Sequence, residues 1–278
     1  MSSKVLTPEQ RQMLEYTHGT RRLVELLIDP VQGHFDAAHL REINRRIFQD
    51  LPGLGLHDIT PGQFRPPVAA HYDWLKTRTF ETINIRSHVA YSRMDEKALA
   101  RLDDNLKEAD PAALAKLDTP AFTKAIGTLY TELDYIHPFS DGNSRTLRAF
   151  TRQLAEASGY NIDWDQFGQS PVGRDLLYIA RDLSVNALAL PHIVHEVTRR
   201  DVLLTIDQLE GNRDLPSLLE DAVSPIREAH VHIQAEGAVT QGHRSPAFVE
   251  PSLEEQLREQ ERLTPPSPTE TDEPGMDY

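Results

Sequence analysis

Most of the apolar residues recur at steps of three and four, the spacing of one face of an α-helix. This pattern predicts helices over residues 36–50, 94–106 and 119–136. The regular alternation of strands and helices that a parallel α/β fold would show is missing. We therefore expect an all-α protein.

The clearest helix covers residues 119–136. Thr119 stands in the position of an N-cap, and Pro120 suits the first helical turn. The apolar stripe that follows is expected to lie in the core and consists of Phe122, Ile126, Leu129, Leu133 and Ile136. Proline disfavours helical geometry at the residue before it, so this helix should end at His137, next to Pro138. After a turn at Gly142 and Asn143, a second helix is predicted from Ser144 to about Gly159.

Residues 79–92 (TFETINIRSHVAYS) contain the one plausible pair of strands. Residues typical of strands, such as Phe80, Ile85 and Val89, surround a polar centre at Ser87. We expect a small β-hairpin that forms an extended flap rather than the core of a sheet.

The chain is expected to divide into four parts: an N-terminal helical extension over residues 1–34, a main domain over 35–200, a C-terminal helical extension over 201–249, and a tail over 250–278. The tail contains nine acidic and two basic side chains and is rich in proline. Because it has few large apolar residues, we expect it to be disordered. A short helix capped by Ser252 would have too thin an apolar face to dock firmly.

Composition narrows the possible function classes. The net charge of −14 argues against broad binding of nucleic acid. The chain has no cysteine, so disulfides and thiolate metal sites are excluded. It has neither a run of about 18 apolar residues nor a hydrophobic leader, so we expect no membrane span and a cytoplasmic location. Secretion as an effector into a host cell stays open.

Candidate chemistry is concentrated in residues 137–148 (HPFSDGNSRTLR), where the two central helices meet. The N–H groups and dipole at a helix start favour a bound anion, and Gly142 lets the backbone approach it closely. Arg145 and Arg148 are three positions apart, so both can reach one anionic ligand. Asp141 offers the hard oxygen that Mg²⁺ prefers, and His137 can accept a proton near neutral pH. Together they indicate phosphate chemistry on a nucleotide, with a hydroxyl as the nucleophile.

This segment resembles the signature of the Fic family, His-x-Phe-x-(Asp/Glu)-Gly-Asn-x-Arg, which is often followed by a second arginine three positions later. The stretch LREINRRIFQD followed by TPGQFR is similar to the family's first helix and its Gly-Gln-x-Arg turn. The expected flap falls where the family has a β-hairpin that positions the target side chain. The resemblance covers about residues 35–200 and implies a Fic-type helical bundle.

The resemblance also implies a function: a protein adenylyltransferase, which transfers AMP from ATP to a serine, threonine or tyrosine hydroxyl of a target protein. His137 would be the general base that deprotonates this hydroxyl. Asp141 would hold Mg²⁺ on the α- and β-phosphates of ATP. Taken singly, each residue has a structural alternative, since a histidine often ends a helix and Asp-Gly-Asn often only forms a turn.

The rest of the motif would bind the nucleotide. Gly142 and Asn143 would form the anion hole, while Arg145 and Arg148 would hold the β- and γ-phosphates. Ser144 departs from the pattern, because adenylyl-transferring members usually have glycine there and members related to the phosphorylating toxin Doc have lysine. Serine adds no charge, so AMP transfer is favoured. The alternatives are transfer of phosphate, another nucleotide donor, and a non-catalytic module that binds a nucleotide or a partner.

Many Fic proteins carry an inhibitory helix with the pattern (Ser/Thr)-x-x-x-Glu-(Gly/Asn), whose glutamate pairs with the second motif arginine. The segment IDQLEGN places Glu210 before Gly211, but Ile206 occupies the hydroxyl position. Glu210 is thus a candidate inhibitory residue, and an ordinary helix end is the alternative. Without an internal inhibitor, the chain would have either a separate small antitoxin-like partner or no inhibitor.

Overall fold

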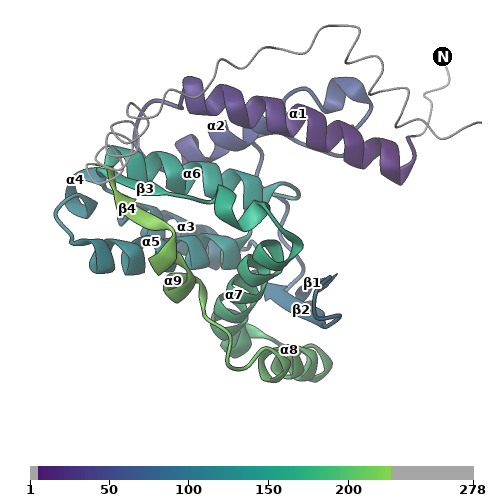
Figure 1. Ribbon diagram of the computed structural model, residues 1–278. Helices are drawn as coiled ribbons and strands as arrows, with labels where there is room; N and C mark the ends of the chain where they lie inside the picture. The colour runs from purple at the N-terminus through teal and green to yellow at the C-terminus, as the bar shows by residue number, and fades with distance from the viewer. Residues whose placement is uncertain (1–5, 227–278) are drawn as a thin grey trace, which may run out of the picture. The chain divides into compact units, whose positions relative to one another are not determined.

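The computed structural model describes residues 6–226, which form a helical bundle with two small antiparallel sheets (Figure 1). The helices are α1 (Pro8–Ile28), α2 (Ala37–Phe48), α3 (Glu96–Lys107), α4 (Pro111–Leu114), α5 (Thr119–Ile136), α6 (Asn143–Ala157), α7 (Pro171–Ala189), α8 (Glu196–Gln208) and α9 (Leu215–Leu218). Single 3₁₀ turns cover Pro52–Leu54, Asp165–Gly168, Leu190–His192 and Leu219–Asp221. The predicted helical bundle is confirmed, whereas the helix expected at Ser252 and the acidic tail lie outside the described residues.

Helix α5 is the central element of the bundle and packs against α3, α6, α7 and α9. The five apolar residues of its predicted stripe are at most 5% exposed. Its N-cap differs from the prediction, because the side chain of Asp118 accepts a hydrogen bond from the N–H of Ala121 at 2.9 Å. Thr119 is therefore already the first helical residue, since the carboxylate one position earlier reaches the free N–H groups better.

Helix α1 lies along α2 near α6, at the edge of the bundle (Figure 1). It starts with a capping box between Thr7 and Gln10, whose side chains each bond to the other's backbone N–H. Arg22 holds Asp50, just beyond α2, through two hydrogen bonds of 2.8 and 2.7 Å. These contacts fix α1 against the end of α2.

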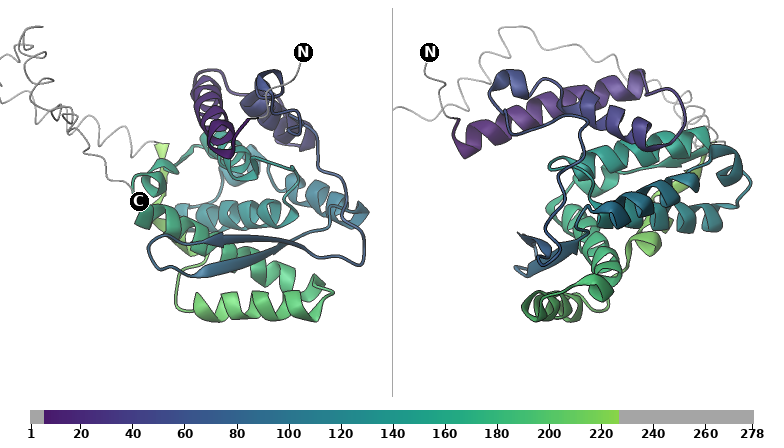
Figure 2. Two further views of the ribbon diagram at one scale, coloured as in Figure 1. Left: turned by 90° about the vertical axis from the view of Figure 1, so that its right-hand side faces the viewer. Right: turned by 180° about the vertical axis from the view of Figure 1, so that it is seen from behind.

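The flap consists of β1 (Trp74–Thr79) and β2 (Arg86–Tyr91), paired so that Trp74 lies opposite Tyr91. Strand β2 packs against α5, α7 and α8, and β1 is the outer strand (Figure 2). The hairpin is confirmed, but β1 begins before the predicted segment. Ser87 was wrongly taken as its polar centre, since it lies within β2, where its hydroxyl donates to the buried carboxylate of Asp182 at 2.6 Å.

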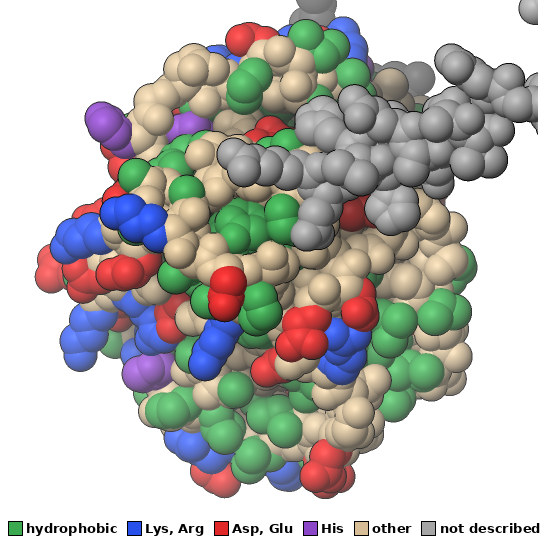
Figure 3. Space-filling model, turned by 60° about the vertical axis from the view of Figure 1, so that its left-hand side comes forward, with side chains coloured by type: hydrophobic (Ala, Val, Ile, Leu, Met, Phe, Trp, Pro, Cys, Tyr) green, Lys and Arg blue, Asp and Glu red, His purple; other side chains and the backbone are tan. Residues whose placement is uncertain are grey.

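A second sheet pairs β3 (Tyr160–Ile162), directly after α6, with β4 (Val223–Pro225). Helix α9 and strand β4 pack against α5. The ring of Tyr160 stacks on that of Phe122 of α5, with 3.9 Å between the ring centroids. No helix within residues 6–226 has both the length and the apolar character needed to cross a bilayer. On the face drawn in Figure 3, acidic and basic side chains lie interspersed, with apolar side chains between them.

Candidate active site

The loop between α5 and α6, residues 137–142, is closed by the side chain of Asn143. Its amide oxygen accepts a hydrogen bond from the N–H of Phe139 at 2.9 Å, and its amide nitrogen donates to the Phe139 carbonyl at 2.6 Å. Phe139 itself is 1% exposed and packs against Phe64. The loop is therefore anchored in the core at its middle, as a pre-formed turn rather than a mobile connection.

Arg65, from the Gly-Gln-x-Arg turn, fastens the same loop to the flap. Its Nε donates to the carbonyl of His137 at 2.7 Å, and a terminal nitrogen donates to the carbonyl of Ser92 at 2.6 Å. The guanidinium also lies 3.6 Å from the ring centroid of Trp74. Burial lowers the pKa of Arg65 to about 9, so it stays charged at neutral pH. Its charge thus lies at the carboxyl end of α5, where the helix dipole is negative.

His137 ends α5 in a left-handed backbone conformation, with φ of 50° and ψ of 61°. This geometry is uncommon for a side chain other than glycine and needs support from its surroundings. It places the imidazole between the rings of Tyr91 and Trp74, whose centroids lie 4.0 and 5.2 Å away. The residue is only 6% exposed, yet it lines the cleft described below.

Two charged side chains face the two nitrogens of this imidazole. Nε2 lies 3.1 Å from the ammonium of Lys76 on the flap. Nδ1 lies 3.5 Å from a carboxylate oxygen of Asp134, which is within ion-pair reach but makes no hydrogen bond. Burial lowers the pKa of His137 to about 4; Asp134 opposes this shift and Lys76 reinforces it. The imidazole is therefore neutral at pH 7 and can accept a proton.

The start of α6 forms an anion-binding feature. Gly142 precedes it with φ of 73°, and the first intrahelical hydrogen bond runs from Thr146 to the Gly142 carbonyl at 3.0 Å. The N–H groups of the intervening residues are thus left without partners inside the helix. A Cβ at Gly142 would lie 2.0 Å from the ring of Phe48, so only glycine fits here.

The cleft in front of this helix start has a volume of about 870 Å³. Its walls come from α1, the flap, the motif loop, α6 and α7. It brings together the seven motif residues that the sequence singles out: His137, Asp141, Gly142, Asn143, Ser144, Arg145 and Arg148. A cleft of this size is in the range of small-molecule and cofactor sites.

Residues 34–155 match the model of the Fic/DOC family. This part of the chain is a Fic domain. Among curated relatives, the protein adenylyltransferase VbhT of Bartonella schoenbuchensis is 30% identical over 154 residues, which are 55% of this chain and 28% of VbhT. The probable protein adenylyltransferase y4lH of Sinorhizobium fredii is 29% identical over 132 residues, 47% of this chain and 58% of y4lH. The chain thus spans less than two thirds of the length of either relative.

Solved structures share the fold. The N-terminal Fic domain of a VirB-translocated Bep effector protein from Bartonella quintana, solved with bound ADP, matches with a TM-score of 0.50 at 19% identity. The match covers 82% of this chain and 92% of that one. The likeness extends beyond residues 34–155, so it includes elements that flank the Fic domain.

Ser144, which departs from the usual Fic motif, takes part in a buried charge network. Its hydroxyl accepts a hydrogen bond from Arg181 of α7 at 3.0 Å. Arg181 also holds both carboxylate oxygens of Asp134, at 2.9 and 3.0 Å. Burial would raise the pKa of Asp134, but Arg181 and then His137 hold it well below its usual range. The serine side chain is therefore occupied by α7, and Asp134 remains a negative neighbour of the imidazole.

Arg145 contacts α1, which the sequence did not associate with the site. Its guanidinium donates to the backbone carbonyl of Glu15 at 3.2 Å and lies 3.5 Å from the Glu15 carboxylate. A Cβ at Gly19 would lie 2.8 Å from Arg145, so this glycine provides the space that the guanidinium fills. A negatively charged ligand at Arg145 must therefore compete with Glu15. The pairing joins residues 130 positions apart, so no local pattern could indicate it.

The structure does not bring Glu210 to the cleft. This exposed residue follows α8 and lines a separate pocket with Leu203 and Leu204. Arg148, its expected partner, lies in the wall of the cleft, where its Nε donates to the Ser144 carbonyl at 3.3 Å.

Asp141 is the one predicted metal ligand, and its geometry limits what it can hold. One carboxylate oxygen accepts a hydrogen bond from the N–H of Gly142 at 2.7 Å, which leaves the other oxygen for an ion. Within residues 6–226, no group of three or more His, Asp or Glu side chains could surround a metal. One free carboxylate oxygen is a donor of the kind that Mg²⁺ takes, since this ion usually binds one or two carboxylates and completes its shell with other oxygens.

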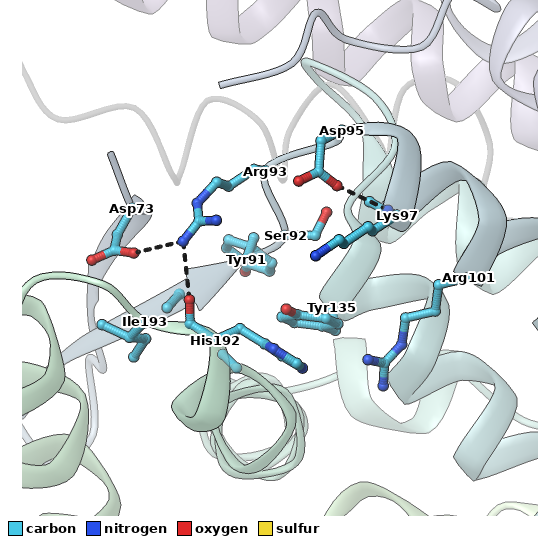
Figure 4. Close-up of a pocket in the computed structure, with 13 residues that line it drawn as sticks. Asp73, Tyr91, Ser92, Arg93, Asp95, Lys97, Arg101, Tyr135, His192 and Ile193 are labelled. Atoms are coloured by element: carbon cyan, nitrogen blue, oxygen red, sulfur yellow. Dashed lines mark hydrogen bonds and ion pairs between the residues drawn. The ribbon is translucent and has the colours of Figure 1, made fainter. Parts of the chain in front are cut away.

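A second pocket of about 210 Å³ lies elsewhere along β2 (Figure 4). It shares only Tyr91 with the cleft and contains no residue of the motif. Its guanidinium groups have protein partners: Arg93 donates to the carbonyl of His192, and Arg101 donates to Glu132. Because no motif residue lines this pocket, the candidate site is the cleft.

The close approach of Phe48 to Gly142 can be tested by mutation. Gly142→Ala should lower the free energy of unfolding by about 3 kcal/mol, because the new Cβ meets the ring in addition to the positive φ. Gly159→Ala is the matched control, since its φ is 84° but no atom lies within 4 Å of the added Cβ. It should cost about 1 kcal/mol. Equal losses in chemical denaturation would show that the Phe48 contact is absent.

The neutral, buried state of His137 predicts a pH dependence of stability. Its pKa is about 4 in the folded protein and 6.5 when unperturbed, so between these values the unfolded chain binds more protons. Stability is therefore lost as the pH falls from 6.5 towards 4. Compared with His137→Gln, the wild-type protein should lose up to about 3 kcal/mol more unfolding free energy between pH 7 and pH 4. Parallel denaturation curves at every pH would contradict this.

Proposed function

We propose that this protein is a protein adenylyltransferase that transfers AMP from ATP to a serine, threonine or tyrosine hydroxyl of a target protein. One observation carries the proposal: a neutral imidazole lines the same cleft as a free helix start and two arginines. The names of the two relatives support this activity, and the ADP bound to the B. quintana Fic domain supports a nucleotide as the ligand.

The phosphates of the nucleotide would bind at the start of α6. Arg145 and Arg148 would hold the β- and γ-phosphates, and the N–H groups after Gly142 would hold the charge that remains. Asn143 would contribute its backbone N–H alone, because its side chain is committed to Phe139. Binding would also replace the contact between Glu15 and Arg145 by one between phosphate and Arg145.

In the transfer step, His137 would accept the proton of the target hydroxyl at Nε2. The hydroxyl oxygen would form a bond to the α-phosphorus, and the bond from this phosphorus to the bridging oxygen of the β-phosphate would break. Pyrophosphate leaves with the electron pair, and AMP remains on the target. Asp134 would stabilise the imidazolium through its charge at 3.5 Å. Catalysis would depend on positioning and fixed charges rather than on a covalent enzyme intermediate.

Mg²⁺ would be held by the carboxylate oxygen of Asp141 that does not accept from Gly142. When bound, the ion would supply positive charge that offsets the charge building up on the leaving pyrophosphate.

Two kinds of protein partner are part of the proposal. The target would bind at the flap, because β1 is its outer strand and borders the cleft. A small antitoxin-like inhibitor would act at Arg148, which Glu210 does not approach. We propose that the protein acts in a cytoplasm, either of its own cell or of a host cell that it enters as an effector.

The proposed reaction predicts where a label travels. When the purified chain is incubated with Mg²⁺, cell lysate and ATP labelled at the α-phosphate, a protein band should become labelled. ATP labelled at the γ-phosphate should give no band that depends on the added chain, as a lysate without the chain shows, and His137→Ala should lose at least about 100-fold in rate because the general base is gone. Circular dichroism shows whether the variant is folded. Label from the γ-position alone would instead establish phosphate transfer, and full activity of the variant would refute the role of His137.

The role of Asp141 can be measured without a target protein. Asp141→Asn should weaken Mg²⁺-dependent binding of ATP about 10-fold in calorimetry, because a charged ligand of the ion is lost. Binding in EDTA should stay the same. Asp104→Asn on the exposed side of α3 removes the same charge far from the motif loop and serves as the control. If Asp141→Asn retains the full Mg²⁺ effect, another group holds the ion.

A further inference from the structure

Lys76 reaches into the site from the flap. Trp74, Lys76 and Arg78 alternate along β1, so their side chains share one face of the hairpin. The Lys76 ammonium lies 3.1 Å from Nε2 of His137 and 4.9 Å from the ring centroid of Trp74. Arg78, in contrast, is directed to Asp182 and to the hydroxyl of Tyr91. Lys76 is thus the flap cation that contacts the proposed base.

The surroundings of the imidazole indicate which nitrogen carries its proton. The charged and titratable groups near it are Asp134 of α5, Arg181 of α7, Lys76 of β1 and Tyr91 of β2, together with Arg65, which donates to the backbone carbonyl of His137. A proton on Nδ1 faces the carboxylate of Asp134, which favours the tautomer with a lone pair on Nε2. The ammonium of Lys76 donates a hydrogen bond to that lone pair.

The same lone pair is the one that takes the proton of the target hydroxyl in the proposed reaction. An imidazole nitrogen has a single lone pair, so it cannot accept from Lys76 and from the hydroxyl in the same direction at once. A positive charge on the imidazole would also be strongly disfavoured beside an ammonium at 3.1 Å. The contact between Lys76 and His137 therefore belongs to the protein before the target binds.

We propose that Lys76 is a positioning residue, which occupies the proton-accepting nitrogen of His137 until the target hydroxyl takes its place. This inference rests on the proposed function, since it concerns the same base. Displacement requires only rotation of the lysine side chain. Its ammonium then remains in the cleft with Asp141 and the phosphates, all of opposite charge. The base is thereby held in one orientation and one tautomer, and becomes available when a hydroxyl arrives at the flap.

The contact can be tested by nitrogen NMR of the histidine rings in the full chain without nucleotide. In the wild-type protein, the Nε2 signal of His137, assigned by its loss in His137→Gln, should show an accepted hydrogen bond. In Lys76→Met it should move towards the value of a free lone pair, and the pKa of His137 should rise by about one unit. Arg86→Met removes an exposed cation of the same hairpin and should change neither quantity. An unchanged signal and pKa in Lys76→Met would overturn the proposal.

Activity gives a second readout. In a plot of kcat/KM against pH, the acidic midpoint should move to higher pH in Lys76→Met, by the same amount as the pKa of His137. In Arg86→Met this midpoint should not move. If Lys76→Met still transfers AMP but its acidic midpoint equals that of the wild-type protein, the role of Lys76 is also overturned. If no transfer is found in any variant, the proposed function fails, while the NMR result still decides the contact. Should Lys76→Met not fold, Lys76→Gln removes the same charge with a polar side chain.

Discussion

The buried ion pair between Asp134 and Arg181 connects the three helices α5, α6 and α7 at the motif loop. It joins α5 to α7, reaches α6 through the hydroxyl of Ser144, and supplies the negative charge beside the imidazole of His137. Burying two charges is costly unless their hydrogen-bonding groups are satisfied. Here both carboxylate oxygens and three guanidinium nitrogens have partners, so the pair can exist in the core. Its retention in the interior is easier to understand as a means of orienting the base than as a source of stability.

A second constraint is the backbone conformation of the loop between α5 and α6, residues 137–142, next to the Asp134–Arg181 ion pair. His137 and Gly142 both adopt positive φ, and they lie at the end of one helix and the start of the next. Arg65 and Asn143 hold the loop by hydrogen bonds to its carbonyl and N–H groups, while Phe48 closes the space beneath Gly142. The strain at His137 is thus matched by contacts from three separate elements. This allows the chain to turn sharply while the imidazole and the free N–H groups face one cleft.

Local patterns were enough to predict the parts of this arrangement that depend on neighbouring residues. The stripe on α5, the end of that helix before Pro138 and the new start after Gly142 follow from spacing, proline and glycine. The first strand of the flap could not be recognised, because Lys76, Thr77 and Arg78 give it a polar sequence and its partner is known only from the folded register. Ser87 was misread for the related reason that its partner, Asp182, is 95 positions away.

The charged groups around the base were missed on the same grounds. Asp134 is a carboxylate in the otherwise largely apolar end of α5, three residues before His137, which is the only local sign of its role. Arg181, Lys76 and Glu15 come from distant segments. A signature motif therefore identifies the loop proposed to bind phosphate. The motif does not identify the residues that set the pKa of its histidine, because only the tertiary fold brings these residues next to the imidazole.

The acidity of the whole chain also gives no guide to the cleft. With a net charge of −14, the protein as a whole should repel a polyphosphate. However, charges are screened over about 8 Å in physiological salt, so nearby groups dominate what the cleft binds. Lys76, Arg145 and Arg148 line it, and the helix start adds further partial positive charge. Four carboxylates line the cleft. Glu15 contacts Arg145, Glu81 pairs with Arg174, and Asp175 accepts hydrogen bonds from Thr82. Asp141 is suited to a divalent cation. The charges that line the cleft are therefore compatible with the ligand proposed above, a nucleoside triphosphate that carries Mg²⁺.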